Sequence, residues 1–518
     1  MKRSAVITGT FYLTLAGFIT RLLGFVYRIY LSKLIGSEGM GLYQLISPIY
    51  FLLFTICCAG FQTAISQLVA AQNAHHNIRG MRRILFVCLV PAALFGIFFC
   101  LLMWQLSPWV ALHILHDERA AEGLRIICLG LPFCISGTCL KAYFHGIMHM
   151  GVPAAEQVIE QIFRMTVIYL VSPLLAHANV AEACTLVVWG TVAGDMVSCF
   201  FTLILYGIHR RKNRTWVPAL PSQSRYTSLL RPILIIVIPV TGSRMLTQLL
   251  SSFENIMLPS VLQRSGMSAS SALGLYGEFS GMVMPLLAFP TIVTTALSSN
   301  LLPLVATAKA GGRFSVIHTA IRRSLRFTFL TSFLFAALLG SLGGFIGSAL
   351  YPGTSAGELL QLLALYCPFF YLQSTLGGLL NGSGLQTEVF LYQFVSSGLR
   401  ICIMLTLVPR YGFPAFLLGM LLSLILSSLL SLHKLLSIYH MKLSLFKGLA
   451  MPLLSAAATL MVLRLGARIF ESTLSNSWLF LFIACLGGAA FYLGALLLSR
   501  SLTRQDIAAT LRLVRRKT

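Results

Sequence analysis

The chain has 518 residues, of which 57% are hydrophobic and only 10% are charged, and its mean hydropathy is +0.84. A soluble protein of this length could not bury so much apolar surface, so the composition excludes an ordinary water-soluble domain. The formal net charge is +24, which could indicate nucleic-acid binding. The basic residues gather in every second predicted loop, however, and this pattern indicates membrane topology instead, with no nucleic-acid partner.

Apolar runs of about 20 residues follow one another along the chain, and each is long enough to cross roughly 30 Å of hydrocarbon as a helix. Lipid cannot satisfy an exposed strand edge, so we expect an all-α polytopic membrane protein. The sequence predicts fourteen transmembrane helices, at 8–33, 43–72, 84–106, 121–146, 154–176, 182–208, 230–262, 272–307, 320–348, 357–382, 386–408, 412–438, 448–468 and 477–499.

The basic loops follow even-numbered predicted helices. They contain Arg79, Arg82 and Arg83, then Arg210 to Arg214, then Lys309 and Arg313, then Lys434, Lys442 and Lys447. Cytoplasmic loops carry an excess of Lys and Arg, so both termini are predicted to lie on the cytoplasmic side.

No motif for covalent chemistry is present in the sequence. The 12 cysteines are scattered through apolar runs with no spacing typical of zinc, haem or a redox pair. Phosphate-binding, nucleophile-elbow and zinc-protease motifs are also missing. We therefore predict a protein that is not an enzyme and that holds no metal or cofactor.

The chain reads as two related halves. Pro132, Phe133, Gly146, Gln157 and Arg164 recur, each 236 residues later, as Pro368, Phe369, Gly382, Gln393 and Arg400. Nearer the start of each half, Thr20-Arg21-Leu22-Leu23 matches Ser243-Arg244-Met245-Leu246, and Gly41-Leu42-Tyr43 matches Gly274-Leu275-Tyr276. Six helices per half is an even number, so both halves enter the membrane from the same side. This predicts two six-helix lobes related as parallel repeats, as in transporters that rock two lobes around a central site.

This pattern divides the chain into five predicted parts. They are an N-lobe at 1–208, a basic cytoplasmic linker at 209–229, a C-lobe at 230–440, two extra helices at 441–499 and a basic cytoplasmic tail at 500–518. In the tail, Ile507, Leu511 and Val514 share one helical face, which suits a helix on an anionic lipid leaflet. A frayed basic tail is the alternative.

Three arginines inside predicted helices are the first candidate substrate ligands. An ionised side chain near the bilayer centre costs about 2.5–3.5 kcal/mol on insertion scales, so it needs a partner or a wet cavity. Arg21 and Arg28 lie seven residues apart on the first helix, and Arg244 is the repeat mate of Arg21. Converging guanidiniums suit a polyanion such as a phosphate group. The alternative is that each arginine pairs with an acid or a carbonyl where the lobes meet.

A second group of ionisable residues in the membrane is less specific. Arg164, Arg400 and Lys141 are further candidate substrate ligands, although Glu160 lies one turn before Arg164 and invites a local ion pair. Glu254, Glu278 and Asp195 could bind a coupling cation or act as counter-charges, and pairing is the favoured reading.

The stretch from Thr20 to Tyr50 resembles the N-terminal signature of the stage V sporulation protein B family. The matching parts are Arg21 and Gly24, then Gly36, Glu38-Gly39 and Gly41-Leu42-Tyr43, with Ala64-Ile65-Ser66 and the segment from Pro290 to Pro303 further on. That family belongs to the polysaccharide-transporter branch of the multidrug/oligosaccharidyl-lipid/polysaccharide exporter superfamily.

The resemblance implies a flippase of the bacterial cytoplasmic membrane for undecaprenyl-diphosphate-linked saccharide, such as a peptidoglycan precursor in sporulation and cell-wall synthesis. It implies a cavity role for Arg21 and a lipid-tail groove at the last two helices, and it makes cell-wall synthesis proteins possible partners. A drug or cation exporter of the same superfamily is the alternative, which the arginines of the first helix disfavour. A membrane-embedded glycosyltransferase or polymerase is less favoured, because no acidic cluster is evident.

Overall fold

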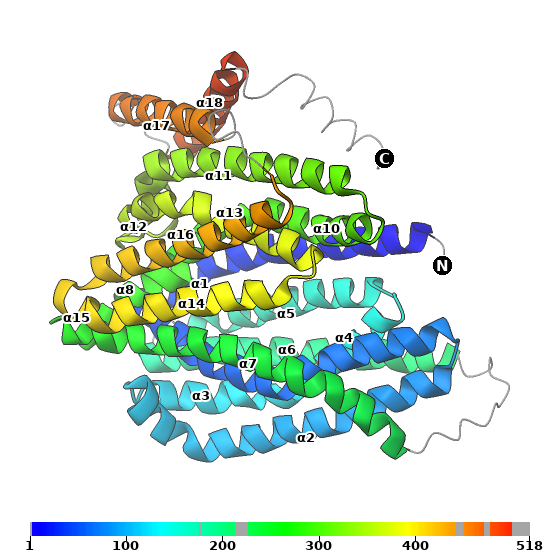
Figure 1. Ribbon diagram of the computed structural model, residues 1–518. Coiled ribbons are helices and arrows are strands. Elements are labelled where there is room, and N and C mark those ends of the chain that lie inside the picture. The colour runs from blue at the N-terminus through cyan, green and yellow to red at the C-terminus, as the bar shows by residue number, and fades with distance from the viewer. Residues whose placement is uncertain (1–2, 176–177, 213–225, 442–448, 471–476, 500–518) are drawn as a thin grey trace. The chain divides into compact units, whose positions relative to one another are not determined.

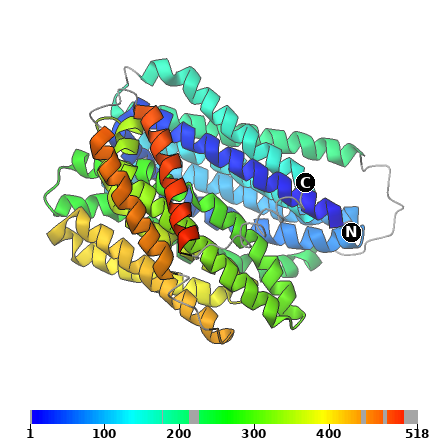
Figure 2. The same cartoon turned by 90° about the horizontal axis from the view of Figure 1, so that it is seen from above.

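The structure is a computed structural model that describes residues 3–175, 178–212, 226–441, 449–470 and 477–499. These residues are helical almost throughout and contain no strand, which confirms the predicted all-α membrane class (Figures 1 and 2). The chain divides into two compact units, Met1–Gly281 (unit 1) and Met282–Thr518 (unit 2).

Unit 1 is built from long helices joined by short turns. Its elements are α1 (Arg3–Ala74), α2 (Ile78–Val110), the π-helical turn η1 (Ala111–Leu115), α3 (Ala120–Leu129), α4 (Leu131–Gly146), α5 (Gly151–Leu175), α6 (Val180–Lys212), α7 (Tyr226–Arg264), α8 (Ala269–Tyr276) and the start of the π-helical turn η2 (Gly277–Val283). Helix α1 covers the first two predicted spans, and it bends at Gly36, whose φ of 68° is a left-handed value that suits glycine.

Unit 2 is also built from helices joined by short turns. Its elements after the end of η2 are α9 (Met284–Ala288), α10 (Thr291–Ala310), α11 (Phe314–Leu350), α12 (Ala356–Leu363), the 3₁₀ turn η3 (Ala364–Tyr366), α13 (Cys367–Gly382), α14 (Gln386–Thr406), α15 (Val408–Tyr411), α16 (Phe413–Ile438), α17 (Met451–Phe470) and α18 (Ser477–Leu498).

Several predicted spans prove to be broken helices. The span predicted at 121–146 is interrupted at Gly130, and the span at 357–382 is interrupted by η3. A proline follows each break at the second position of the next helix, where its missing N–H costs nothing. Ten helices in the described part of the chain are long and apolar enough to cross a membrane. The count of fourteen stays a prediction.

The helix boundaries repeat with the same spacing as the sequence motifs. Helices α2 and α11 begin at residues 78 and 314, α3 and α12 at 120 and 356, and α4 and α13 at 131 and 367. Each pair differs by 236, so the two halves share local structure as well as residues. The parallel arrangement of the two lobes in space stays a prediction.

The compact units end at a different place from the predicted lobes. Unit 1 extends to Gly281, because α7 and α8 pack against α1. Gly60 on α1 lies directly against Thr241 and the backbone of Val237 on α7, so a side chain there would clash. The Ser252 hydroxyl also donates a 3.0 Å hydrogen bond to the Pro48 carbonyl. The predicted linker at 209–229 mostly lies outside the described residues, as does the tail at 500–518.

Helices α1 and α8 cross through the two copies of the Gly-Leu-Tyr motif. A Cβ atom at Gly41 would clash with the Leu273 carbonyl, and one at Gly277 would clash with the Ser37 carbonyl. The Tyr276 hydroxyl donates a 3.4 Å hydrogen bond to the Gln44 carbonyl. Small residues thus let the two backbones approach closely, as at many helix crossings in membranes. We call this contact the glycine crossing.

Helices α17 and α18 pack on α11 in unit 2. Phe333, Ala456, Tyr492 and Leu496 form one buried cluster there. The Tyr492 hydroxyl also donates to the Leu330 carbonyl at 3.1 Å. The appended helix pair is therefore attached through both apolar packing and a polar contact.

Polar contacts at helix ends show which loops of unit 1 lie near each other. At one end, Arg119 pairs with Glu38 at 2.8 Å and with Asp117 at 2.8 Å, and the hydrogen bonds that Arg119 donates to Asp117 raise the pKa of Arg119 above its ordinary value. At another helix end, Arg82 donates to the Arg210 carbonyl at 3.2 Å. The sequence predicts the loops near 38 and 119 on one membrane side and those near 82 and 210 on the other, and both contacts agree with this grouping.

Candidate functional site

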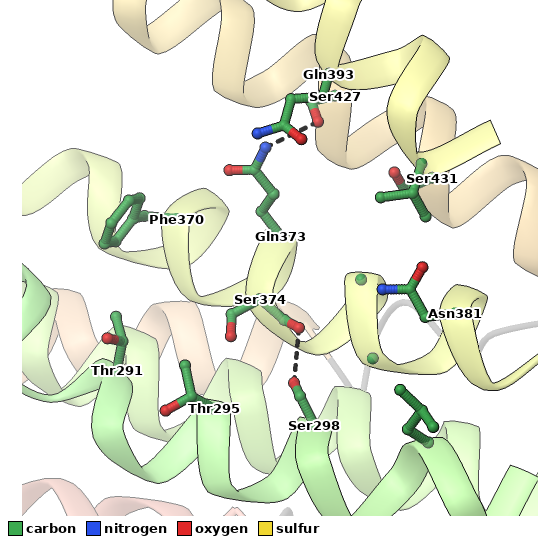
Figure 3. A pocket seen from close by; sticks show the side chains of 14 residues that line it. Thr291, Thr295, Ser298, Phe370, Gln373, Ser374, Asn381, Gln393, Ser427 and Ser431 are labelled. Carbon is green, nitrogen blue, oxygen red and sulfur yellow. Dashed lines mark hydrogen bonds between the residues drawn. The ribbon is translucent and has the colours of Figure 1, made fainter. Parts of the chain in front are cut away.

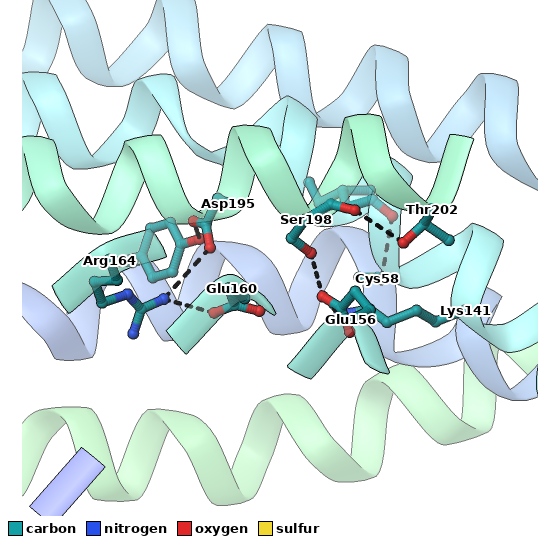
Figure 4. A network of polar contacts seen from close by, with 10 residues as sticks. Cys58, Lys141, Glu156, Glu160, Arg164, Asp195, Ser198 and Thr202 are labelled. Carbon is teal, nitrogen blue, oxygen red and sulfur yellow. Dashed lines mark hydrogen bonds and ion pairs between the residues drawn. The ribbon is translucent and has the colours of Figure 1, made fainter. Parts of the chain in front are cut away.

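A buried ion cluster joins α5, α6 and α1 in unit 1. Arg164 on α5 lies 2.6 Å from Glu160, one turn earlier, and 3.7 Å from Asp195 on α6 (Figure 4). The Tyr50 hydroxyl on α1 donates to the other oxygen of Asp195 at 2.7 Å. Asp195 is only 6% exposed, so its charge needs these partners. Asp195 thus lies beside a cation, and its predicted role as a counter-charge or as a ligand of a coupling cation stays a prediction.

A second ion pair lies beside this cluster. Lys141 on α4 donates to Glu156 on α5 at 3.0 Å, and the Ser198 hydroxyl on α6 donates to the same carboxylate oxygen (Figure 4). Glu156 is fully buried. Lys141 and Arg164 are therefore both held by acids of their own unit, and their role as substrate ligands stays a prediction.

The arginines of α1 and α7 lie in surroundings that differ from those of Lys141 and Arg164. Arg21 and Arg244 are exposed, and Arg28 is half-buried. An exposed guanidinium in the middle of a transmembrane helix is costly in hydrocarbon, and a cavity role for these arginines stays a prediction. Arg28 and Arg244 form no ion pair with any described residue. The convergence of all three arginines on one ligand stays a prediction.

The remaining predicted residues are spread over the molecule. Glu254 on α7 is buried at 8% exposure, and Glu278 in η2 is half-buried. Arg400 is half-buried on α14, in unit 2, and is thus in a different unit from its repeat mate Arg164. The described residues include no cluster of three or more His, Cys, Asp or Glu side chains that could hold a metal ion.

Unit 2 contains a cavity of about 520 Å³ between α10, α13, α14 and α16, and most of the residues that line it have uncharged polar side chains (Figure 3). Its described lining is Thr291, Thr295, Ser298, Leu302, Phe370, Gln373, Ser374, Gly377, Gly378, Asn381, Val389, Gln393, Ser427 and Ser431. None of these side chains carries a formal charge. The cavity volume falls within the usual range for small-molecule sites, about 300–1,000 Å³. We call this space the unit 2 cavity.

Helical spacing explains how the sequence builds this cavity. Gln373, Gly377 and Asn381 are four residues apart on α13, so they share one face. Thr291, Thr295 and Ser298 lie four and then three residues apart on α10, so they also share one face. Two contacts fix the walls: Ser298 donates to the Ser374 carbonyl at 2.6 Å, and Gln373 donates to the Ser427 hydroxyl at 3.1 Å.

Sequence reasoning centred on charged residues and missed this cavity. The signal was present, because polar uncharged residues recur at i, i+4 and i+7 within strongly apolar helices. Gln393 stands out in the sequence only as the repeat mate of Gln157.

The fold is shared with solved structures of membrane transporters. The chain superposes on the solved structure of lipid II flippase MurJ in an inward closed conformation, with a TM-score of 0.71, 14% sequence identity and coverage of 95% of this chain and 99% of that one. It also superposes on an inward-facing multidrug resistance transporter of the MATE family and the MOP superfamily, with a TM-score of 0.65, 13% identity and coverage of 82% and 96%.

The chain belongs to the polysaccharide biosynthesis protein family, whose model matches residues 6–309. Stage V sporulation protein B of Bacillus subtilis (strain 168) is a relative, 25% identical over 410 residues that cover 79% of each chain. These similarities confirm the family resemblance in the segment from Thr20 to Tyr50.

Proposed function

We propose that the protein is a flippase that moves an undecaprenyl-diphosphate-linked saccharide from the cytoplasmic to the outer leaflet of the bacterial cytoplasmic membrane. The observation that carries this proposal is the balance of charge in unit 1. Glu156, Glu160 and Asp195 are each held by a cation, whereas Arg28 and Arg244 form no ion pair among the described residues. Among these five residues, the charge without an ionic partner is positive and suits a diphosphate.

The fold similarity to a multidrug transporter makes a cation exporter the second candidate. Such a substrate would require an available carboxylate, and the three acids above already have cationic partners. Family membership in polysaccharide biosynthesis also favours the saccharide lipid. Movement would follow alternating access, with the two lobes rocking and without ATP hydrolysis by this chain.

Substitution of Arg21 or Arg244 by alanine is expected to weaken binding of an undecaprenyl-diphosphate-linked disaccharide by about tenfold to a hundredfold. Each lost charge-assisted hydrogen bond is worth about 1.5–3 kcal/mol, and about 1.4 kcal/mol is a factor of ten. Lysine at either position should rescue only part of the affinity, because it keeps the charge but loses the planar fork. Binding is measured on purified protein at matched folded amounts.

Arg231, exposed on α7, provides the control, and Arg231→Ala should bind like the unsubstituted protein. Unchanged affinity in both Arg21→Ala and Arg244→Ala would reject the role of these arginines. Efflux of lipophilic cations without any binding of the saccharide lipid would favour the exporter instead.

Labelling of single cysteines tests the proposed orientation. In a background without native cysteines, Glu118→Cys should react with a membrane-impermeant reagent in intact cells, because Glu118 is exposed between α2 and α3. Arg211→Cys, at the end of α6, should react only after the membrane is opened. The reverse pattern would show that the termini lie outside.

A further inference from the structure

The side chains that line the unit 2 cavity can form hydrogen bonds but carry no formal charge. Asn381 and Gln393 line it with amide groups that make no hydrogen bond to any described residue, and hydroxyls of α10 and α16 complete the wall. An amide donates through its nitrogen and accepts through its oxygen, so such a lining can pair with ligand hydroxyls in both senses. A diphosphate would find no counter-charge among these residues.

A comparison of repeat-related positions in the two halves explains why this space is found in unit 2. Gly377 corresponds to Lys141 at the shared spacing of 236 residues. In unit 1 the lysine side chain extends from this position to Glu156 and forms the buried ion pair. In unit 2 the same position has no side chain, and a Cβ atom built there would meet nothing within 4 Å.

The neighbouring glycine has a different environment. A Cβ atom at Gly378 would lie 2.7 Å from the Cβ of Ser298, where α13 and α10 touch. Gly378 is thus required by helix packing, whereas packing does not explain Gly377. The empty space beside Gly377 is the cavity itself, since Gly377 is one of its lining residues.

We propose that the unit 2 cavity binds the uncharged, hydroxyl-rich saccharide part of the lipid-linked substrate, an inference that rests on the proposed flippase function. Sugar hydroxyls would exchange hydrogen bonds with Asn381, Gln393 and the serine and threonine hydroxyls. A site built to hydrogen-bond ligand hydroxyls discriminates strongly against a ligand that lacks them, because its own polar groups are then left unpaired. The cavity would therefore distinguish substrates by their sugar.

The test compares two probes, undecaprenyl diphosphate and the same lipid carrying a disaccharide. Gly377→Leu fills the cavity without a clash at its Cβ and should lower affinity for the disaccharide lipid by about tenfold. Its affinity for undecaprenyl diphosphate should stay within about twofold. Asn381→Leu should behave in the same way, because it removes an amide and keeps the volume. Gly398→Leu is the control, since Gly398 in the same unit also faces open space but does not line the cavity.

The outcomes separate this inference from the proposed function. If the unsubstituted protein binds the disaccharide lipid and Gly377→Leu and Asn381→Leu both leave that affinity unchanged, the cavity proposal is wrong while the flippase proposal stands. If the unsubstituted protein binds neither probe, the proposed function itself fails. An equal loss of affinity for both probes in Gly377→Leu would place the diphosphate, not the sugar, near the cavity and would overturn the assignment.

Discussion

Arg164→Ala is expected to destabilise the protein by about 3–5 kcal/mol, because it leaves two carboxylates in unit 1 without their cation. Asp195 is buried, and Glu160 lies 2.6 Å from the guanidinium that would be removed. Thermal unfolding of the detergent-purified protein, with the yield of monodisperse material, measures the loss. We expect a clear fall in the unfolding midpoint.

Replacing the two acids by neutral amides as well should restore much of this stability. The triple variant Arg164→Met, Glu160→Gln and Asp195→Asn removes the whole set of charges, and replacing a complete buried ion cluster is often neutral. If the triple variant is no more stable than Arg164→Ala, the ion cluster does not explain the loss. If Arg164→Ala keeps full stability but loses substrate binding, Arg164 is a substrate ligand as the sequence first suggested.

Gly41→Leu is expected to prevent recovery of folded protein. Even a Cβ atom at this position would clash with the Leu273 carbonyl, so the larger side chain would force α1 and α8 apart. Overpacking costs about 1–3 kcal/mol where side chains can adjust, and a backbone carbonyl adjusts less easily. The amount of monodisperse protein after membrane extraction measures the effect.

Gly17→Leu is the matched control on the same helix. A Cβ atom at Gly17 meets nothing within 4 Å, so this variant should be recovered normally. Equal recovery of both variants would mean that the close approach at the glycine crossing is not required for folding.

The sequence predicted the helical class and the repeat well, because both depend on local patterns. The length of an apolar run of residues identifies a membrane helix. The 236-residue spacing of Pro132 and Pro368 also marks where helices α4 and α13 begin, since proline is favoured in the first turn of a helix. The breaks at Gly130 and η3 were not predicted, because the sequence stays largely apolar through both of them.

The candidate site was harder to predict, since charge alone does not show which groups meet. The Arg164–Glu160 pair could be predicted from one turn of helix, but Asp195 and Tyr50 join it through tertiary packing. Likewise, Lys141 and Glu156 come from different helices. The unit 2 cavity depends on four helices meeting around Gly377, and one glycine among 42 carries no such information by itself.

The glycine crossing brings the two copies of one segment into contact, since residues 37–44 contact residues 273–277. The two copies do not make equivalent contacts, however. The Tyr276 hydroxyl donates to the Gln44 carbonyl, whereas the hydroxyl of its repeat mate Tyr43 lies 3.3 Å from that of Thr191. The two copies are therefore subject to different constraints, and position 44 holds glutamine while its counterpart Gly277 is glycine against the Ser37 carbonyl.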